Sequence, residues 1–216
     1  MSAGGAQDPT PHWGLRPEFD HLGGLQRHVS LALRARTGPQ NLICLCSSYA
    51  RTAMDAVGEH SSRDGIRVSV VESDPRTARS LREHARSRHV VLDVVAGDAG
   101  STDAYLDAVP ADVVLASGSL ADSAAGSLSR TTSAIRLLCA EGATIVWSHA
   151  LSWPDRAREA RRLFGSDSFT EISTDRVGEH TRWPGWLVGS SGIVPLPFAP
   201  GVELFDEVSG TTAWAG

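Results

Sequence analysis

The sequence has few cysteines, no basic excess and no long apolar run. Its three cysteines cannot form the disulfide framework of a small secreted domain, and its first residues lack a signal-peptide pattern, so we expect a reducing, cytoplasmic location. A net charge of -5 leaves little to neutralise phosphates, so we expect no nucleic-acid partner. No apolar run reaches the roughly 18 residues that span a bilayer, so we expect no membrane partner. The 216 residues suffice for one domain with a sizeable core.

Two of the cysteines, Cys44 and Cys46, are separated by a single residue. If their segment is a strand, both side chains point to the same face. A metal site would need two further ligands nearby, and none is evident in the sequence. We therefore interpret the pair as core residues, since free cysteine is among the most buried residue types.

Apolar strands and helical patterns alternate along most of the chain. A helical pattern over residues 18–35 precedes them, and a helix over 124–142 is predicted to end at Gly142. Strands are expected at 41–46, 66–72, 90–98, 111–118 and 143–149, and further helices at 51–60, 73–88, 102–109 and 154–165. This order is typical of an α/β fold with a doubly wound, mostly parallel sheet.

Two last strands are expected at 169–174 and 186–194, with no helix between them. They predict an antiparallel β-hairpin at the C-terminal end of the sheet. The chain then divides into a flexible N-terminus with a helical segment (1–38), the α/β domain (39–194) and an irregular tail rich in proline and glycine (195–216).

Candidate ligand-binding residues follow the carboxyl ends of the predicted strands, where open α/β sheets bind ligands. Glu72 ends the second strand and can accept hydrogen bonds from two ribose hydroxyls; the alternative, a helix-capping acid, is already supplied by Asp74. Asp98 ends the third strand and can accept from an exocyclic amine, or simply stabilise a turn. Ser117 and Gly118 end the fourth strand, where residues touch cofactor and substrate; the alternative is a helix-entry loop of small residues.

Two histidines are candidate general bases. His149 ends the fifth strand, and His180 lies in the connection before the last strand; a histidine in either place can take a proton near neutral pH. The alternative is a structural or solvent-exposed ring. Trp183 and Trp186 lie near His180 and can either wall a substrate pocket or pack the hairpin onto the sheet.

These motifs, in this order, resemble the class I S-adenosylmethionine-dependent methyltransferases, in a form common in actinobacteria. The resemblance rests on "VVESDPRTARSLREHA", "VVAGDAGSTDAYLDAVPADVVLASGSLAD" and "LCAEGATIVWS", and spans about residues 20–194. It implies a seven-stranded Rossmann-like sheet, a lid formed by the N-terminal helix and S-adenosylmethionine as cofactor. The cofactor-binding residues it implies, by match to ribose, adenine, methionine and rim positions, are Cys46, Ser47, Ser48, Arg51, Glu72, Ser73, Asp98, Ala99, Ser117 and Gly118.

The loop after the first strand departs from the family pattern, because Ser48 and Ala50 replace glycines and only Arg51 is retained. At a positive φ each replacement costs about 1–2 kcal/mol; at a negative φ it only narrows the pocket. Two functions therefore stay open. One is a methyltransferase acting on a small molecule, as in specialised-metabolite biosynthesis. The other is the same fold used by a non-methylating biosynthetic enzyme or a binding or partner subunit. A homodimer is also left open.

Overall fold

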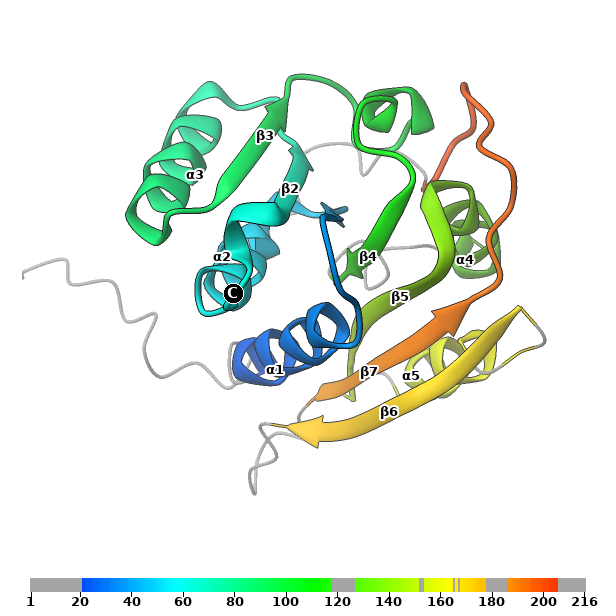
Figure 1. Cartoon of the computed structure of the whole chain (residues 1–216). Helices are drawn as coiled ribbons and strands as arrows, with labels where there is room; N and C mark the ends of the chain where they lie inside the picture. The colour runs from blue at the N-terminus through cyan, green and yellow to red at the C-terminus, as the bar shows by residue number, and fades with distance from the viewer. Residues whose placement is uncertain are drawn as a thin grey trace, which may run out of the picture.

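The computed structural model describes residues 21–117, 127–151, 154–164, 166, 168–177 and 186–205. One seven-stranded sheet runs through it in the order β3-β2-β1-β4-β5-β7-β6 (Figure 1). The strands are β1 (Gln40–Cys44), β2 (Ile66–Val71), β3 (Val91–Val95), β4 (Ala111–Ala116), β5 (Cys139–Ala150), β6 (Phe169–Val177) and β7 (Trp186–Ile193). The helices are α1 (His21–Arg34), α2 (Ala50–Gly58), α3 (Pro75–Arg88), α4 (Ser127–Ile135) and α5 (Pro154–Leu163). The predicted α/β fold with a mostly parallel sheet is confirmed.

The order in which successive strands are added to the sheet reverses beside β1, and ligands usually bind at such a point. β1 pairs in parallel with β2 on one side and with β4 on the other, so the chain fills the sheet outward from β1 in both directions. In such a sheet the crevice beyond the carboxyl ends of the strands opens at this switch point. The loops after β1, β2, β3 and β4 therefore decide what the protein can bind.

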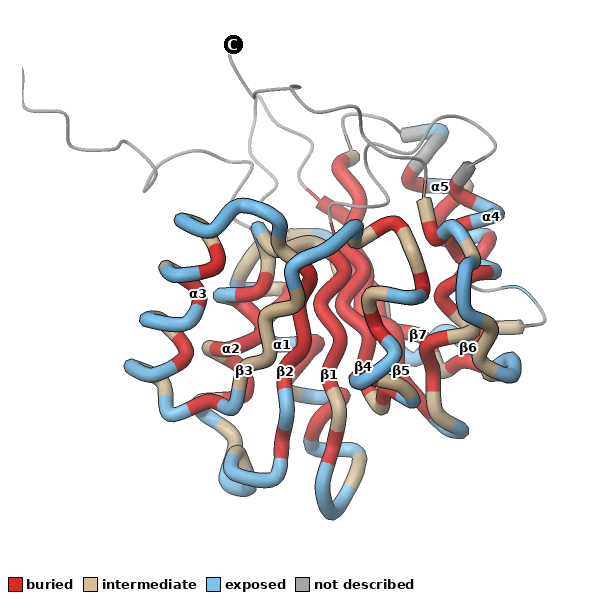
Figure 2. The backbone as a smooth tube through the Cα atoms, turned by 90° about the horizontal axis from the view of Figure 1, so that it is seen from above, coloured by how far each residue is buried: buried red, intermediate tan, exposed pale blue. Residues whose placement is uncertain are grey.

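Helices cover both faces of the sheet, and the strand sequences show why. Leu42 and Cys44 of β1 belong to the core on the side of α1, α2 and α3, whereas Ile43 and Leu45 belong to the core on the side of α4 and α5. A strand buried on both faces is mostly apolar, and β1 is apolar over residues 42–44 after two polar residues at its start (Figure 2). The interpretation of Cys44 as a core residue is confirmed, and its burial raises the pKa of the thiol. The same interpretation is wrong for Cys46, which lies past the end of β1 and is only partly buried.

The predicted antiparallel hairpin is confirmed at the C-terminal end of the sheet. β7 pairs antiparallel with both β5 and β6, so Trp186 at the start of β7 lies opposite Ala150 at the end of β5. Trp186 is thereby brought to the same rim of the sheet as the loop after β1. Residues 194–205 form no helix or longer strand, only an isolated bridge from Glu203 to Ser101.

The prediction that Gly142 ends a helix over 124–142 is wrong. In the described part of that range, α4 ends at Ile135, a 3₁₀ turn follows over Arg136–Leu138, and the chain enters β5 at Cys139. Gly142 has φ +69° inside β5, where the pairing with β4 is irregular. A left-handed backbone conformation often ends a helix, but in this protein it forms a bulge within a strand.

Two further features bear on function. None of the described helices is long and apolar enough to cross a membrane. Within the same residues, no group of three or more histidine, cysteine, aspartate or glutamate side chains is arranged to hold a metal ion.

Candidate cofactor site at the rim of the sheet

The loop after β1 adopts an ordinary backbone despite its lack of glycine. Cys46 is extended with φ -127°, a single 3₁₀ turn spans Ser47–Tyr49, and Ala50 has φ -61°. Among the described residues only His89 is a non-glycine with positive φ, so neither Ser48 nor Ala50 is strained. The substitutions therefore narrow the loop without the backbone cost that a positive φ would bring.

Glu72 lies just beyond β2 and is half-buried at the rim. Its backbone N–H donates to the Val95 carbonyl at 2.9 Å, which holds it beside the end of β3. Its carboxylate accepts from the Ser47 hydroxyl at 2.6 Å on Oε2 and from the Asp74 N–H at 2.7 Å on Oε1. A carboxylate offers about four lone-pair sites, so each oxygen can accept one more hydrogen bond.

The capping role weighed against Glu72 belongs to Asp74, as the sequence indicated. Asp74 accepts from the N–H groups of Arg76 and Thr77 at the start of α3, and the Thr77 hydroxyl donates to it at 2.8 Å. These bonds, the hydroxyl first, lower the pKa of Asp74. Glu72 is therefore not needed to cap α3. Ser73, between the two acids, is exposed.

Asp98 lies on an exposed loop after β3, and one of its two carboxylate oxygens is fixed by a hydrogen bond. Its Oδ1 accepts from the Gly100 N–H at 2.7 Å, which leaves Oδ2 without a hydrogen bond to the described residues. The neighbouring Ala99 carbonyl accepts from the Tyr105 hydroxyl at 3.1 Å. Tyr105 is 1% exposed, and burial raises the pKa of its hydroxyl, which keeps it a donor.

The C-terminal segment also anchors this loop, a feature that could not be predicted from the sequence. Val202 accepts from the Thr102 N–H at 3.0 Å, and the Leu204 N–H donates to the Gly100 carbonyl at 2.6 Å. The Thr102 hydroxyl donates to the Ala199 carbonyl at 2.9 Å and accepts from the Val202 N–H at 3.0 Å. Residues about a hundred positions apart therefore fix the backbone on which Asp98 stands.

The ends of β4 and β5 meet through two buried serines. The hydroxyls of Ser117 and Ser148 lie 2.5 Å apart, and both side chains are 0% exposed. His149 is also 0% exposed, and its Nδ1 lies 3.2 Å from the Ala150 carbonyl. His149 is the last but one residue of β5, and the pairing of β5 with β7 leaves it buried near the carboxyl end of the strand.

Three aromatic rings from distant segments meet at the rim beside the loop. The His21 ring, at the start of α1, stacks on Trp186 with centroids 3.9 Å apart and meets Tyr49 edge-on at 5.5 Å. Helix α1 is thus packed against the loop after β1, and its role as a lid stays a prediction. The sequence suggested Trp186 as a pocket wall but gave no reason to place His21 against it.

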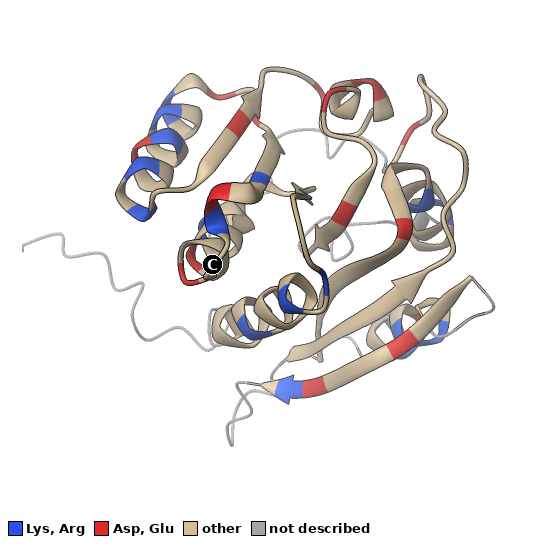
Figure 3. Ribbon diagram, viewed as in Figure 1, with Lys and Arg blue, Asp and Glu red and all other residues tan. Residues whose placement is uncertain are grey.

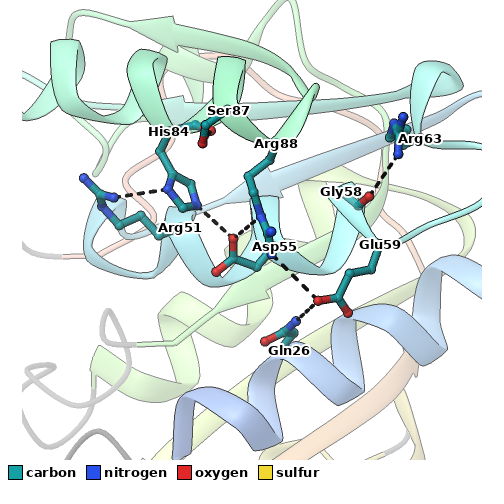
Figure 4. Close-up of polar contacts among 9 residues, drawn as sticks. All are labelled: Gln26, Arg51, Asp55, Gly58, Glu59, Arg63, His84, Ser87 and Arg88. Atoms are coloured by element: carbon teal, nitrogen blue, oxygen red, sulfur yellow. Dashed lines mark hydrogen bonds and ion pairs between the residues drawn. The ribbon is translucent and has the colours of Figure 1, made fainter. Parts of the chain in front are cut away.

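Arg51 points away from the loop. Its guanidinium donates to the Ser80 hydroxyl at 2.7 Å and lies 3.2 Å from His84 Nδ1, both on α3. His84 in turn lies 2.9 Å from Asp55, as Figure 4 shows. Arg51 therefore ties α2 to α3 in this structure, and a contact with a cofactor stays a prediction. Gly118, His180 and Trp183 lie outside the described residues.

No protein-family model and no curated protein matches the sequence. The fold, however, is similar to solved structures. The N-methyltransferase NodS from Bradyrhizobium japonicum, solved with S-adenosyl-L-homocysteine, has a TM-score of 0.60 at 13% identity, over 87% of this chain and 93% of that chain. The [4+2]-cyclase SpnF has a TM-score of 0.58 at 13% identity, over 81% of each chain. An O-methyltransferase family 2 protein from Planctomyces limnophilus, in complex with apigenin, has a TM-score of 0.52 at 14% identity, over 78% of this chain and 62% of that chain.

The fold is therefore the Rossmann-like α/β fold of the class I S-adenosylmethionine-dependent methyltransferases. The order β3-β2-β1-β4-β5-β7-β6, with β7 antiparallel, is the seven-stranded arrangement that the resemblance implied. At identities this low the similarity establishes the fold and leaves the reaction to be argued from the site.

Proposed function

We propose that the protein is an S-adenosylmethionine-dependent methyltransferase that acts on a small molecule, in the biosynthesis of a specialised metabolite. One observation carries the proposal: two carboxylates, Glu72 and Asp98, follow the adjacent parallel strands β2 and β3 on one side of the switch point, and both keep hydrogen-bonding capacity. Such a pair suits the hydroxyls of a ribose and the amine of an adenine. The two carboxylates, as hydrogen-bond acceptors, therefore fit the adenosine half of the cofactor.

Each part of the rim has a role in this proposal. Glu72 and Ser73 hold the ribose, Asp98 and Ala99 the adenine, and the loop of Cys46, Ser47 and Ser48 the methionine part. When bound, S-adenosylmethionine supplies an activated methyl group on sulfur. The protein contributes mainly by holding an acceptor in line with that methyl.

The aromatic cluster of His21, Tyr49 and Trp186 supports a small organic acceptor. Tyr49, the partly exposed ring of the three, lies in the loop that would carry the methionine part, whereas His21 and Trp186 are buried behind it. One structural neighbour is an O-methyltransferase in complex with apigenin, a precedent for a small acceptor on this fold. A general base is needed only if the acceptor carries a proton, and His149 and His180 stay the candidates. His149 would have to act from a buried position.

A second candidate is the same fold used for a reaction without methyl transfer. It is favoured by the loop of Cys46–Tyr49, which contains no glycine, and by the cyclase SpnF among the structural neighbours. In that case the rim holds an adenosyl group only as a structural ligand, or holds none.

Calorimetric titration with S-adenosylhomocysteine tests the proposal. We expect Glu72→Gln to weaken binding by about 10- to 100-fold, because a charge-assisted hydrogen bond is lost. Ser48→Trp should abolish binding by filling the exposed side of the loop. Glu141→Gln makes the same charge change at the far end of β5 and should bind normally. If the wild type binds S-adenosylhomocysteine and all three variants bind it equally well, this site is rejected. If the protein binds the cofactor but transfers a methyl group to no acceptor, the second candidate is favoured.

A further inference from the structure

One flank of α3 carries a continuous row of exposed arginines. Arg76, Arg79, Arg82 and Arg86, here called the arginine face, are all exposed. At about 100° per residue their spacing of three, three and four keeps them within an arc of about 120°. Arg79, Arg82 and Arg86, with Glu83, line a shallow hollow of about 390 Å³ on the surface. Figure 3 shows the blue segments concentrated on this helix.

The arginine face contrasts in charge with the rest of the chain. With five arginines and one glutamate, α3 carries a net charge of +4. The whole chain carries -5, so the other 202 residues together carry -9. The chain has no lysine, so all 20 of its lysine-plus-arginine residues are arginines. Arginine is the side chain that pairs with carboxylates in a planar, two-pronged geometry.

Contacts within the fold explain Arg88, on the other flank of α3, but do not explain the arginine face. Arg88 and His84 turn toward α2 and bind Asp55 there, as Figure 4 shows. On the arginine face, Arg82 Nη2 lies 3.4 Å from the Val94 carbonyl of edge strand β3. None of the four makes an ion pair with the described residues. Like charges three or four residues apart destabilise a helix, and no ion pair between these four arginines and the described residues offsets that repulsion.

The same comparison holds for α5, the other arginine-rich helix. There Arg158 is paired with Asp155, and Arg161 with Glu171. Single arginines elsewhere, such as Arg34 and Arg162, are also exposed without an ion pair to the described residues. The arginine face differs from them because four such arginines lie together on one flank of a helix.

We propose that the arginine face docks an acidic helix of a partner protein. From Arg76 to Arg86 the row extends about 15 Å, or three helical turns. A partner helix with carboxylates three and four residues apart repeats the same spacing and can pair with the arginines one to one. A nucleic acid is disfavoured, because a duplex would extend beyond these three turns over a surface that carries net negative charge.

The test uses fluorescence anisotropy with a labelled, alanine-based helical peptide of about 20 residues that carries glutamate at three- and four-residue spacing. The protein should bind this peptide and not its glutamine counterpart, and binding should weaken with salt. The variant Arg79→Glu/Arg82→Glu/Arg86→Glu should bind at least about 10-fold more weakly. Arg130→Glu/Arg162→Glu/Arg176→Glu changes the net charge equally at exposed sites elsewhere and should bind normally.

Three results would overturn the proposal. The first is equal binding of the glutamate peptide by the wild type and the α3 variant, and the second is an equal loss in the control variant. The third is tighter binding of an RNA or DNA duplex than of the peptide at the same salt, which would point to a nucleic acid instead. If the triple variant does not fold by circular dichroism, Arg79→Gln/Arg86→Gln tests the same point with smaller changes. The inference does not depend on the proposed function.

Discussion

Replacing Thr102 by valine should weaken the attachment of the C-terminal segment to the loop that carries Asp98. The Thr102 side chain is 0% exposed, and its hydroxyl makes two hydrogen bonds, to Ala199 and Val202. Valine has nearly the same shape but cannot form either bond, so a carbonyl and an N–H lose their partner. Each group left unsatisfied costs about 1–3 kcal/mol when buried. Allowing for partial hydration, we expect the free energy of unfolding to fall by about 2–4 kcal/mol.

Thermal unfolding and hydrogen exchange both measure this effect. For a protein of this size a loss of 1 kcal/mol lowers the midpoint by about 2–4 °C, so the expected decrease is about 4–16 °C. The Leu204 N–H, bonded to the Gly100 carbonyl at 2.6 Å, should exchange faster in the variant. Exchange in β1 and β4 should stay slow, because the sheet itself is untouched.

Thr131→Val is the matched control. Thr131 is also 0% exposed, but its hydroxyl has no hydrogen-bond partner among the described residues. Removing an unsatisfied buried hydroxyl should leave stability unchanged or raise it by up to about 2 kcal/mol. An equal loss in both variants, or no loss in Thr102→Val, would refute the role given to the Thr102 hydroxyl.

Two further predictions concern the C-terminal hairpin. A Cβ on Gly189 would lie 2.5 Å from the ring of the buried Trp147, whereas one on Gly192 would meet only a carbonyl at 3.9 Å. Chemical denaturation should therefore show a loss of at least about 1–3 kcal/mol for Gly189→Ala and a clearly smaller one for Gly192→Ala; equal losses would contradict this packing. The hydrogen bond from Arg161 lowers the pKa of Glu171, so the pair stabilises the fold above about pH 4.5 and stops doing so as the pH falls through the lower folded value. Urea unfolding should show Glu171→Gln less stable than the wild type by under about 1 kcal/mol at pH 7, with the gap shrinking as the pH falls below about 4.5; no gap at pH 7 would contradict the ion pair.

The strands were predictable because strands of a parallel sheet leave a simple pattern. β1, β2 and β4 are mostly apolar, and each is followed by an amphipathic helix. The cap of α3 was predictable too, since Asp74 and Pro75 act on their immediate neighbours. Local chemistry of this kind is contained in a few consecutive residues.

Other features could not be predicted, because the residues involved are compatible with more than one local structure. Gly142 supplies a positive φ, which suits both a helix end and a bulge, and only the pairing of β4 with β5 decides between them. In the loop after β1, serine and alanine are compatible with several backbones, and the structure adopts one with negative φ. The burial of His149 follows from β5 extending to Ala150 beside β7.

Contacts between distant segments left no sign in the sequence. The bonds from Thr102 to residues 199–202 join polar groups about a hundred positions apart. The stacking of His21 on Trp186 likewise needs the antiparallel β7 to bring its first residue to the rim. Both contacts shape the candidate site, and both become visible only in three dimensions.

The central claim is that the rim between β1 and β3 grips an adenosyl group through Glu72 and Asp98. The most direct measurement is the thermal midpoint of the wild type with and without S-adenosylhomocysteine. At a concentration 100 times the dissociation constant, the ligand should add about 2.7 kcal/mol and raise the midpoint by about 5–11 °C. The rise should be strongly reduced in Glu72→Gln and Asp98→Asn. An unchanged midpoint at millimolar ligand would contradict the claim.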